Sequence, residues 1–233
     1  MSNTTTYALG AVALALIVLI VIVAIRWGRD EATVRNDGYG PVRDPAVQSV
    51  LEQNGSILLG RPDAKKTIDL FEDPLCPGCG NLERIYGQEI AQKTDEGALA
   101  VRYRLVNFLD ARSQSKDYST RAVAANQCVA EAGSGQVYSK FHTELFTTKR
   151  PSEGGGDLSN EALAAIARDA GAPEPVLQCI TTGAKVDFAR TTAMAQTAAL
   201  GAALGGSAAT PAVFEGTTKI DANDENWVIS LTH

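Results

Sequence analysis

The motif that most constrains the fold is Cys76-Pro77-Gly78-Cys79, which lies between an apolar run at residues 68–71 and a stretch with helical spacing. A cysteine in the first turn of a helix lies beside unpaired backbone N–H groups and the positive end of the helix dipole, which stabilise a thiolate. Cys76 is therefore expected to be the nucleophile, and Pro77 suits the first helical position because its fixed φ is helical. Cys79, one turn further on, would be the resolving thiol. The spacing predicts a redox-active disulfide between these two cysteines, with no other cofactor.

Zinc binding is the main alternative for this motif, because C-x-x-C also occurs in zinc sites. Such a site needs a second close pair of ligands, whereas the other two cysteines, Cys128 and Cys179, are far apart in the sequence. The chain has only two histidines, His142 and the terminal His233. His142 has aromatic and apolar neighbours, so we expect a partly buried helix residue there. No metal site is predicted.

The composition is that of an ordinary globular protein. The chain has 233 residues, of which 45% are apolar, and can bury one core with an elaboration or two small domains. Its net charge of −6 is not accompanied by a basic stripe, which argues against a nucleic-acid partner.

Residues 7–25 are all apolar or small, a run of about the length that crosses a bilayer as a helix. No small-residue cleavage site follows, and Trp27 suits the membrane interface. We therefore predict a short tail at residues 1–6 and a retained anchor at residues 7–27, with a cleaved signal as the alternative.

Two features disagree about the orientation of this anchor. The arginines that follow it, Arg26, Arg29, Arg35 and Arg43, favour a cytoplasmic soluble domain. Four cysteines and a membrane tether favour an oxidising, extracytoplasmic compartment. We give the cysteines more weight, because large domains are translocated largely regardless of such charges.

Residues 28–55 are rich in turn formers and predict a juxtamembrane linker, with a short helix near residues 45–53.

The soluble part begins with a strand–helix–strand pattern. Residues 66–71 predict a buried strand and residues 99–106 alternate as a second strand would. The helix that Cys76 opens carries Leu82, Ile85 and Ile90 at helical spacing, and Gly97 is placed to end it. A short crossover of this kind predicts a parallel βαβ unit.

A long alanine-rich helical region follows. Helices are predicted at residues 117–132, after Ser159 as far as Gly171, around residues 176–180, and at residues 186–204. Strand patterns return at residues 211–214 and 217–220, and residues 223–232 fit a closing helix. Residues 56–112 and 207–233 thus predict an α/β domain, interrupted by an all-helical insertion at residues 113–206.

Three blocks together resemble the DsbA-like branch of the thioredoxin superfamily, from about residue 59 to the C-terminus. They are the redox motif at residues 71–80, residues 141–146 and residues 205–213. The nearest resemblance is to membrane-anchored actinobacterial members with an extra cysteine pair in the helical domain. It implies a thioredoxin fold with a helical insertion, and a monomeric thiol:disulfide oxidoreductase that oxidises exported proteins. It also implies reoxidation by a membrane partner of DsbB or vitamin-K-epoxide-reductase type.

By this resemblance Pro211 would be a cis-proline opposite the redox helix, leaving the backbone of Thr210 free to pair with an extended substrate. One position departs from the family: the buried acid expected six residues before Cys76 is replaced by Leu70. Glu72 has the same strand parity and is our candidate proton relay. Alternatively, Glu72 and Asp73 are solvated and water carries the proton.

The remaining cysteines either pair with each other or stay free once Cys76 and Cys79 are paired. We expect a structural Cys128–Cys179 disulfide, and the alternative is two buried free thiols. Gly78 provides no side chain to stabilise the Cys76 thiolate, so the direction of the reaction stays open. A membrane-tethered reductase or isomerase, for example in cytochrome c maturation, and a non-catalytic peptide- or metal-binding module are the alternative functions.

Overall fold

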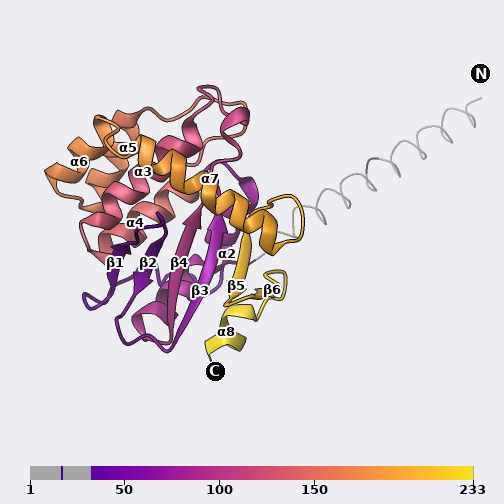
Figure 1. Cartoon of the computed structure of the whole chain (residues 1–233). Coiled ribbons are helices and arrows are strands. Elements are labelled where there is room, and N and C mark those ends of the chain that lie inside the picture. Colours follow the sequence, from indigo (N-terminus) through magenta and orange to yellow (C-terminus); the bar gives the residue numbers. More distant parts are fainter. Residues whose placement is uncertain (1–16, 18–32, 233) are drawn as a thin grey trace, which may run out of the picture. The chain divides into compact units, whose positions relative to one another are not determined.

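A six-stranded mixed sheet forms the centre of the computed structural model, which describes residue 17 and residues 33–232 (Figure 1). The strand order is β1-β2-β4-β3-β5-β6, and only β3 and β4 pair in parallel. The strands are β1 (Gln48–Leu51), β2 (Ile57–Gly60), β3 (Lys66–Glu72), β4 (Leu99–Leu105), β5 (Ala212–Glu215) and β6 (Thr218–Ile220).

The parallel pair is joined by helix α2 (Pro77–Asp95), which confirms the predicted βαβ unit. Lys66 pairs with Leu99 and Glu72 with Leu105, so both strands end at the same edge of the sheet. Most residues of β3 and β4 are buried, so the two strands form the centre of the sheet. Helix α2, with Cys76 before it, starts from this edge.

Five helices lie between β4 and β5 in the sequence. They are α3 (Tyr118–Glu131), α4 (Gly135–Phe146), α5 (Asn160–Ala170), α6 (Glu174–Thr181) and α7 (Val186–Ala203), preceded by a short 3-10 helix η1 (Asp110–Arg112). The predicted start and end of α5 are confirmed: the Ser159 side chain accepts a hydrogen bond from Ala162 N, and Gly171 has a φ of 102°. Helix α8 (Trp227–Thr232) closes the chain.

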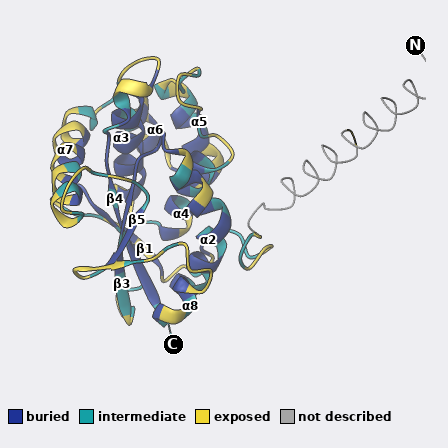
Figure 2. Ribbon diagram, turned by 90° about the vertical axis from the view of Figure 1, so that its right-hand side faces the viewer, coloured by how far each residue is buried: buried dark blue, intermediate teal, exposed yellow. Residues whose placement is uncertain are grey.

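The two faces of the sheet have different covers. Figure 2 shows the strands as a buried layer between α7 on one side and α2, α4 and α8 on the other. Phe71 packs with Leu200 and Phe214 in a small cluster on the α7 side. Leu70, the neighbouring residue in β3, belongs to the main core. Since side chains alternate along a strand, Glu72 points to the same side as Leu70.

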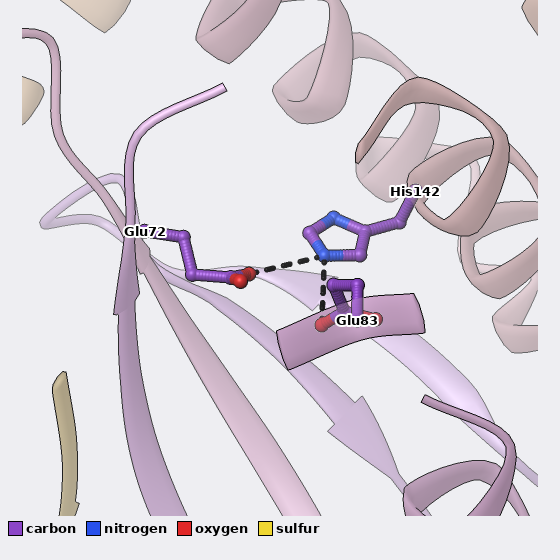
Figure 3. A group of neighbouring side chains, drawn as sticks. All are labelled: Glu72, Glu83 and His142. Atoms are coloured by element: carbon purple, nitrogen blue, oxygen red, sulfur yellow. Dashed lines mark ion pairs between the residues drawn. The ribbon is translucent and has the colours of Figure 1, made fainter. Parts of the chain in front are cut away.

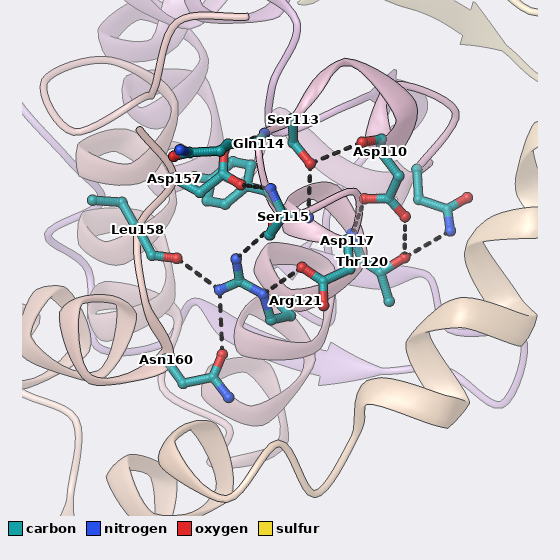
Figure 4. Close-up of polar contacts among 12 residues, drawn as sticks. Asp110, Ser113, Gln114, Ser115, Asp117, Thr120, Arg121, Asp157, Leu158 and Asn160 are labelled. Atoms are coloured by element: carbon teal, nitrogen blue, oxygen red, sulfur yellow. Dashed lines mark hydrogen bonds and ion pairs between the residues drawn. The ribbon is translucent and has the colours of Figure 1, made fainter. Parts of the chain in front are cut away.

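Polar contacts fix the connection between β4 and α3 (Figure 4). Arg121 donates to Ser115 Oγ, to the Leu158 carbonyl and to Asp117. Asp110 accepts hydrogen bonds from the backbone N–H and hydroxyl of Thr120. These contacts attach the helical region to the strand edge from which it leaves.

Cys128 of α3 and Cys179 of α6 form a disulfide, the pair that the sequence predicts. Their Cα atoms are 6.0 Å apart, and the bond closes a loop between residues separated by 51 positions. The disulfide therefore joins two helices that are distant in the sequence.

The helix predicted near residues 45–53 is wrong. Residues 48–51 form strand β1, which pairs antiparallel with β2. Val42 and Val47 are buried, so the described part of the predicted linker, residues 33–55, folds onto the domain instead of forming a free tether. Strand β1 packs against α3 and α4, which are distant in the sequence, so the local pattern does not reveal it.

The predicted tail at residues 1–6 lies outside the described residues, as do the predicted anchor, apart from residue 17, and residues 28–32. Among the residues that are described, no helix combines the length and apolar character needed to span a bilayer.

Candidate active site

Cys76 is the residue at which helix α2 begins. It has an extended backbone conformation, and Pro77 occupies the first turn, as the sequence predicts. The Cys76 side chain reaches the surface, with 8% of the residue exposed, whereas Cys79 is fully buried. Both thiols are free in this structure. A substrate sulfur can therefore reach Cys76 but not Cys79.

Asp73 organises the turn between β3 and α2. Its carboxylate accepts hydrogen bonds from the backbone N–H groups of Leu75 and Leu109 and from the hydroxyl of Ser119. Its backbone carbonyl accepts from Cys76 N at 2.9 Å. Burial raises the pKa of Asp73 to about 7, although these hydrogen bonds oppose the shift. The loop that presents Cys76 is thus tied to the ends of both central strands.

The Thr210–Pro211 peptide bond is cis and lies against the motif. Cys76 Sγ lies 3.5 Å from the Thr210 carbonyl oxygen, to which the protonated thiol can donate. A Cβ atom added at Gly78 would lie 3.0 Å from Pro211 Cδ and 3.7 Å from Cys76 Sγ. Gly78 therefore allows this loop to approach the helix closely, a role that the sequence analysis missed.

The surroundings of the two thiols shift their pKa values in opposite directions. Hydrogen bonds from the side chains of Cys79 and Thr210, and from the backbone N–H groups of Cys79 and Gly78, lower the pKa of Cys76 to about 5 despite partial burial. Burial raises the pKa of Cys79 well above its usual value, and the Glu72 charge adds to this. At neutral pH the pair therefore holds one accessible thiolate and one buried thiol.

Glu72 lies in a buried group of ionisable side chains with His142 and Glu83 (Figure 3). His142 Nε2 is 3.2 Å from a Glu72 oxygen and 3.4 Å from a Glu83 oxygen. Burial, followed by repulsion from Glu83, raises the pKa of Glu72 to about 8, although His142 opposes the shift. The alternative that Glu72 and Asp73 are solvated is wrong, because both are fully buried.

His142 is a helix residue, as predicted, but it is fully rather than partly buried. Its ring lies between the rings of Tyr103 and Phe146, with centroids at 4.2 and 4.3 Å. Burial opposes a charge on the ring, but the hydrogen bonds to Glu72 and Glu83 outweigh it and raise the pKa to about 9. The sequence analysis missed Glu83, although its place one turn after Cys79 puts both on the same face of α2.

This group is also the one set of side chains, within the described residues, that has the spacing of a metal site. The three donor atoms lie within 4.8 Å of one another. A protonated His142 offsets one carboxylate charge, and the raised pKa of Glu72 favours its neutral form at neutral pH, so the group does not need a cation.

A cavity of about 730 Å³ lies beside α2. Its lining includes Pro77, Gly80 and Glu83 of α2, Phe146 of α4, and Arg150. Arg150 donates to the carbonyl of Leu75 at 3.1 Å, which links this cavity to the redox loop.

Comparison with known proteins agrees with this geometry. The thioredoxin family profile matches residues 52–228. MdbA, a thiol-disulfide oxidoreductase from Corynebacterium diphtheriae, is 26% identical and aligns over 82% of this chain and 96% of its own, with a TM-score of 0.71. DsbA from Mycobacterium tuberculosis is 30% identical over 80% of this chain and 97% of its own, with a TM-score of 0.57.

A curated sequence relative is also similar over most of the chain. The serine/threonine-protein kinase PknE of Mycobacterium tuberculosis is 37% identical over 180 residues, which are 76% of this chain but 31% of the kinase. The chain thus spans less than a third of the length of the curated relatives it matches.

An α/β fold of this type, with two neighbouring cysteines opposite a cis-proline, is similar to the DsbA-like thiol:disulfide oxidoreductases. The chain belongs to the thioredoxin family.

Proposed function

We propose that Cys76 and Cys79 introduce disulfides into exported proteins that carry reduced cysteines. The observation that carries this proposal is the contrast between an accessible Cys76 with a pKa of about 5 and a buried Cys79 with a raised pKa. A sulfur that is stable as a thiolate is a good leaving group. Electrons therefore tend to flow from the substrate to this cysteine pair.

The reaction proceeds by two thiol–disulfide exchanges. A substrate thiolate attacks Cys76 Sγ in the Cys76–Cys79 disulfide, which forms a mixed disulfide and releases Cys79 as a thiolate that takes up a proton. A second substrate thiolate then attacks the substrate sulfur of the mixed disulfide and releases Cys76 as a thiolate. The substrate loses two electrons and gains a disulfide, and the enzyme pair is reduced.

The Thr210–Pro211 loop is proposed to hold the substrate during these steps. Its position against Cys76 suits an extended peptide that pairs with the backbone of Thr210 beside the reacting sulfur. Glu72 is proposed as the group that exchanges the proton with Cys79. Replacement of Glu72 by Gln should slow the Cys79 step and change its pH dependence, and unchanged turnover would remove Glu72 from the mechanism.

The cellular setting is proposed from the sequence and the disulfide. The apolar residues 7–25 would anchor the protein, with the catalytic domain on the extracytoplasmic side of the membrane. A structural disulfide between Cys128 and Cys179 suits an oxidising compartment. The enzyme would act as a monomer and be reoxidised by a membrane partner of DsbB or vitamin-K-epoxide-reductase type.

Refolding of a reduced, denatured protein tests the proposal. The oxidised enzyme should restore the activity of reduced ribonuclease, and the Cys76→Ser variant should not. The Cys128→Ala/Cys179→Ala double variant is the control, because it keeps the redox pair. Reduction of substrate disulfides without this refolding would favour a reductase, and full function of Cys76→Ser would favour a peptide-binding module.

A further inference from the structure

We propose that Glu72, His142 and Glu83 form a proton relay that joins the Cys79 thiol to the cavity beside α2. The proposal rests on the function above, in which Cys79 gains and loses a proton in each cycle. The three side chains come from β3, α4 and α2 and meet inside the core (Figure 3). All three residues are at most 3% exposed.

The contacts of His142 favour a ring that carries two protons. Nε2 faces the carboxylates of Glu72 and Glu83. Nδ1 lies 3.2 Å from Asn126 Oδ1. The Asn126 amide donates its own Nδ2 to the Ala122 carbonyl, so its oxygen is left to accept. The Tyr138 hydroxyl also lies 3.5 Å from Nδ1. Each ring nitrogen therefore has an acceptor within reach, as an imidazolium requires.

The two ends of the relay meet different surroundings. At the inner end, Glu72 is an electrostatic neighbour of the Cys79 thiol. At the outer end, Glu83 lines the 730 Å³ cavity together with Pro77 and Gly80, whereas Glu72 and His142 are not part of that lining. Glu83 is thus the member of the group through which a proton can reach water.

The transfer balances without an external reagent. When the Cys76–Cys79 disulfide is broken, protonated Glu72 gives its proton to the Cys79 thiolate and takes the Nε2 proton of His142. Glu83 takes a proton from water in the cavity and returns it to His142. When Cys79 attacks a mixed disulfide, each proton moves in the opposite direction. No electron passes through these residues. Their proposed role is limited to the transfer of the Cys79 proton.

Four other ionisable groups face the relay. They are Cys76, directly before α2, Cys79 of α2, Tyr103 of β4 and Tyr138 of α4. Burial raises the pKa of both tyrosines well above the usual value, so they stay neutral in the working range.

A two-phase reaction of the reduced protein with 5,5′-dithiobis(2-nitrobenzoate) tests the relay. The first release of thionitrobenzoate reports attack by Cys76, and the second reports attack by Cys79 on the mixed disulfide. Glu83→Gln should slow the second phase by about tenfold at pH 6–7, less than for a base that touches the reacting atom. The first phase should be unchanged, and the pH profile of the second phase should move to higher pH.

Glu89→Gln is the matched control, because Glu89 is equally buried in the same helix but pairs with Arg35. It should leave both phases unchanged. An unaltered second phase in Glu83→Gln, or an equal loss in Glu89→Gln, would overturn the relay. Absence of the first phase in the wild-type protein would overturn the proposed function itself, and the relay with it.

A measurement on the unmodified protein covers the case in which Glu83→Gln does not fold. The chain has only two histidines, so the imidazole ¹⁵N signals of His142 are readily separated from those of His233. Both ring nitrogens of His142 should be protonated at pH 7. A neutral ring, or zinc bound stoichiometrically in the purified protein, would overturn the proposal.

Discussion

Asp73 shows how a single side chain positions the redox centre. Three donors from the turn, from the segment after β4 and from α3 converge on its buried carboxylate. A buried donor that loses its acceptor costs free energy, because water does not replace the lost bond. The place of Cys76 therefore depends on a residue that takes no part in the chemistry.

Replacement of Asp73 by Ala should lower the free energy of unfolding by about 3 kcal/mol, because several buried donors lose their acceptor. Urea unfolding of the reduced protein measures this. Asp63→Ala is the control, since the Asp63 side chain is 72% exposed, and it should change stability by less than about 0.5 kcal/mol. A loss below about 1 kcal/mol for Asp73→Ala would contradict the proposed role of this carboxylate.

The sequence predicted those site residues that a motif identifies, such as the two cysteines and Pro211. It placed Glu72 near the site by strand parity alone. His142 and Glu83 could not be joined to Glu72 in advance, because their contact depends on how α4 packs against α2 and β3. The close approach of Gly78 to Pro211 likewise exists only in the folded chain.

At the scale of elements, the disulfide between α3 and α6 adds a covalent link between two helices that also pack against each other. Cys128 is 3% exposed in the centre of α3. Because the closed loop is long, the bond restricts the unfolded chain strongly in the chain-entropy model.

The Cys128→Ala/Cys179→Ala double variant should lose about 4 kcal/mol of stability, the value that model gives for a loop of this length. Its first phase with the aromatic disulfide reagent should equal that of the wild-type protein. Equal stability of the two proteins, or a changed first phase, would show that the bond has a different role.

Long elements with a clear period were predictable, as α2, α5 and β4 show. The short strands β1 and β2 were not predicted, although β5 and β6, which are no longer, were. The conformation of β1 and β2 is set by pairing with each other and with β4, and so by contacts distant in the sequence.

For the whole molecule, the free energy of unfolding depends on pH through buried ionisable groups whose effects oppose one another. Glu72 and Asp73 have raised pKa values, so the folded state keeps protons that the unfolded state loses as the pH rises from about 4 to about 8. The raised pKa of His142 adds stability that is lost as the pH rises to about 9. Cys76 acts in the opposite sense, because its lowered pKa stabilises the folded state as the pH rises above about 5.

The Cys76→Ser variant separates these contributions. Its free energy of unfolding should fall steadily between pH 5 and pH 9, whereas that of the reduced wild-type protein should fall less because the thiolate compensates. Urea unfolding at pH 5, 7 and 9 with a reductant present measures both. Parallel pH dependences would contradict the assignment of a thiolate to Cys76.

The central claim is that Cys76 is a thiolate at neutral pH, and titration of its reactivity tests this most directly. The rate of alkylation of the reduced protein by iodoacetamide, followed from pH 3 to pH 10, should rise with a midpoint near pH 5. Cys79 is buried and should not react on the same timescale. A midpoint near 9, the ordinary value for a cysteine, would contradict the account.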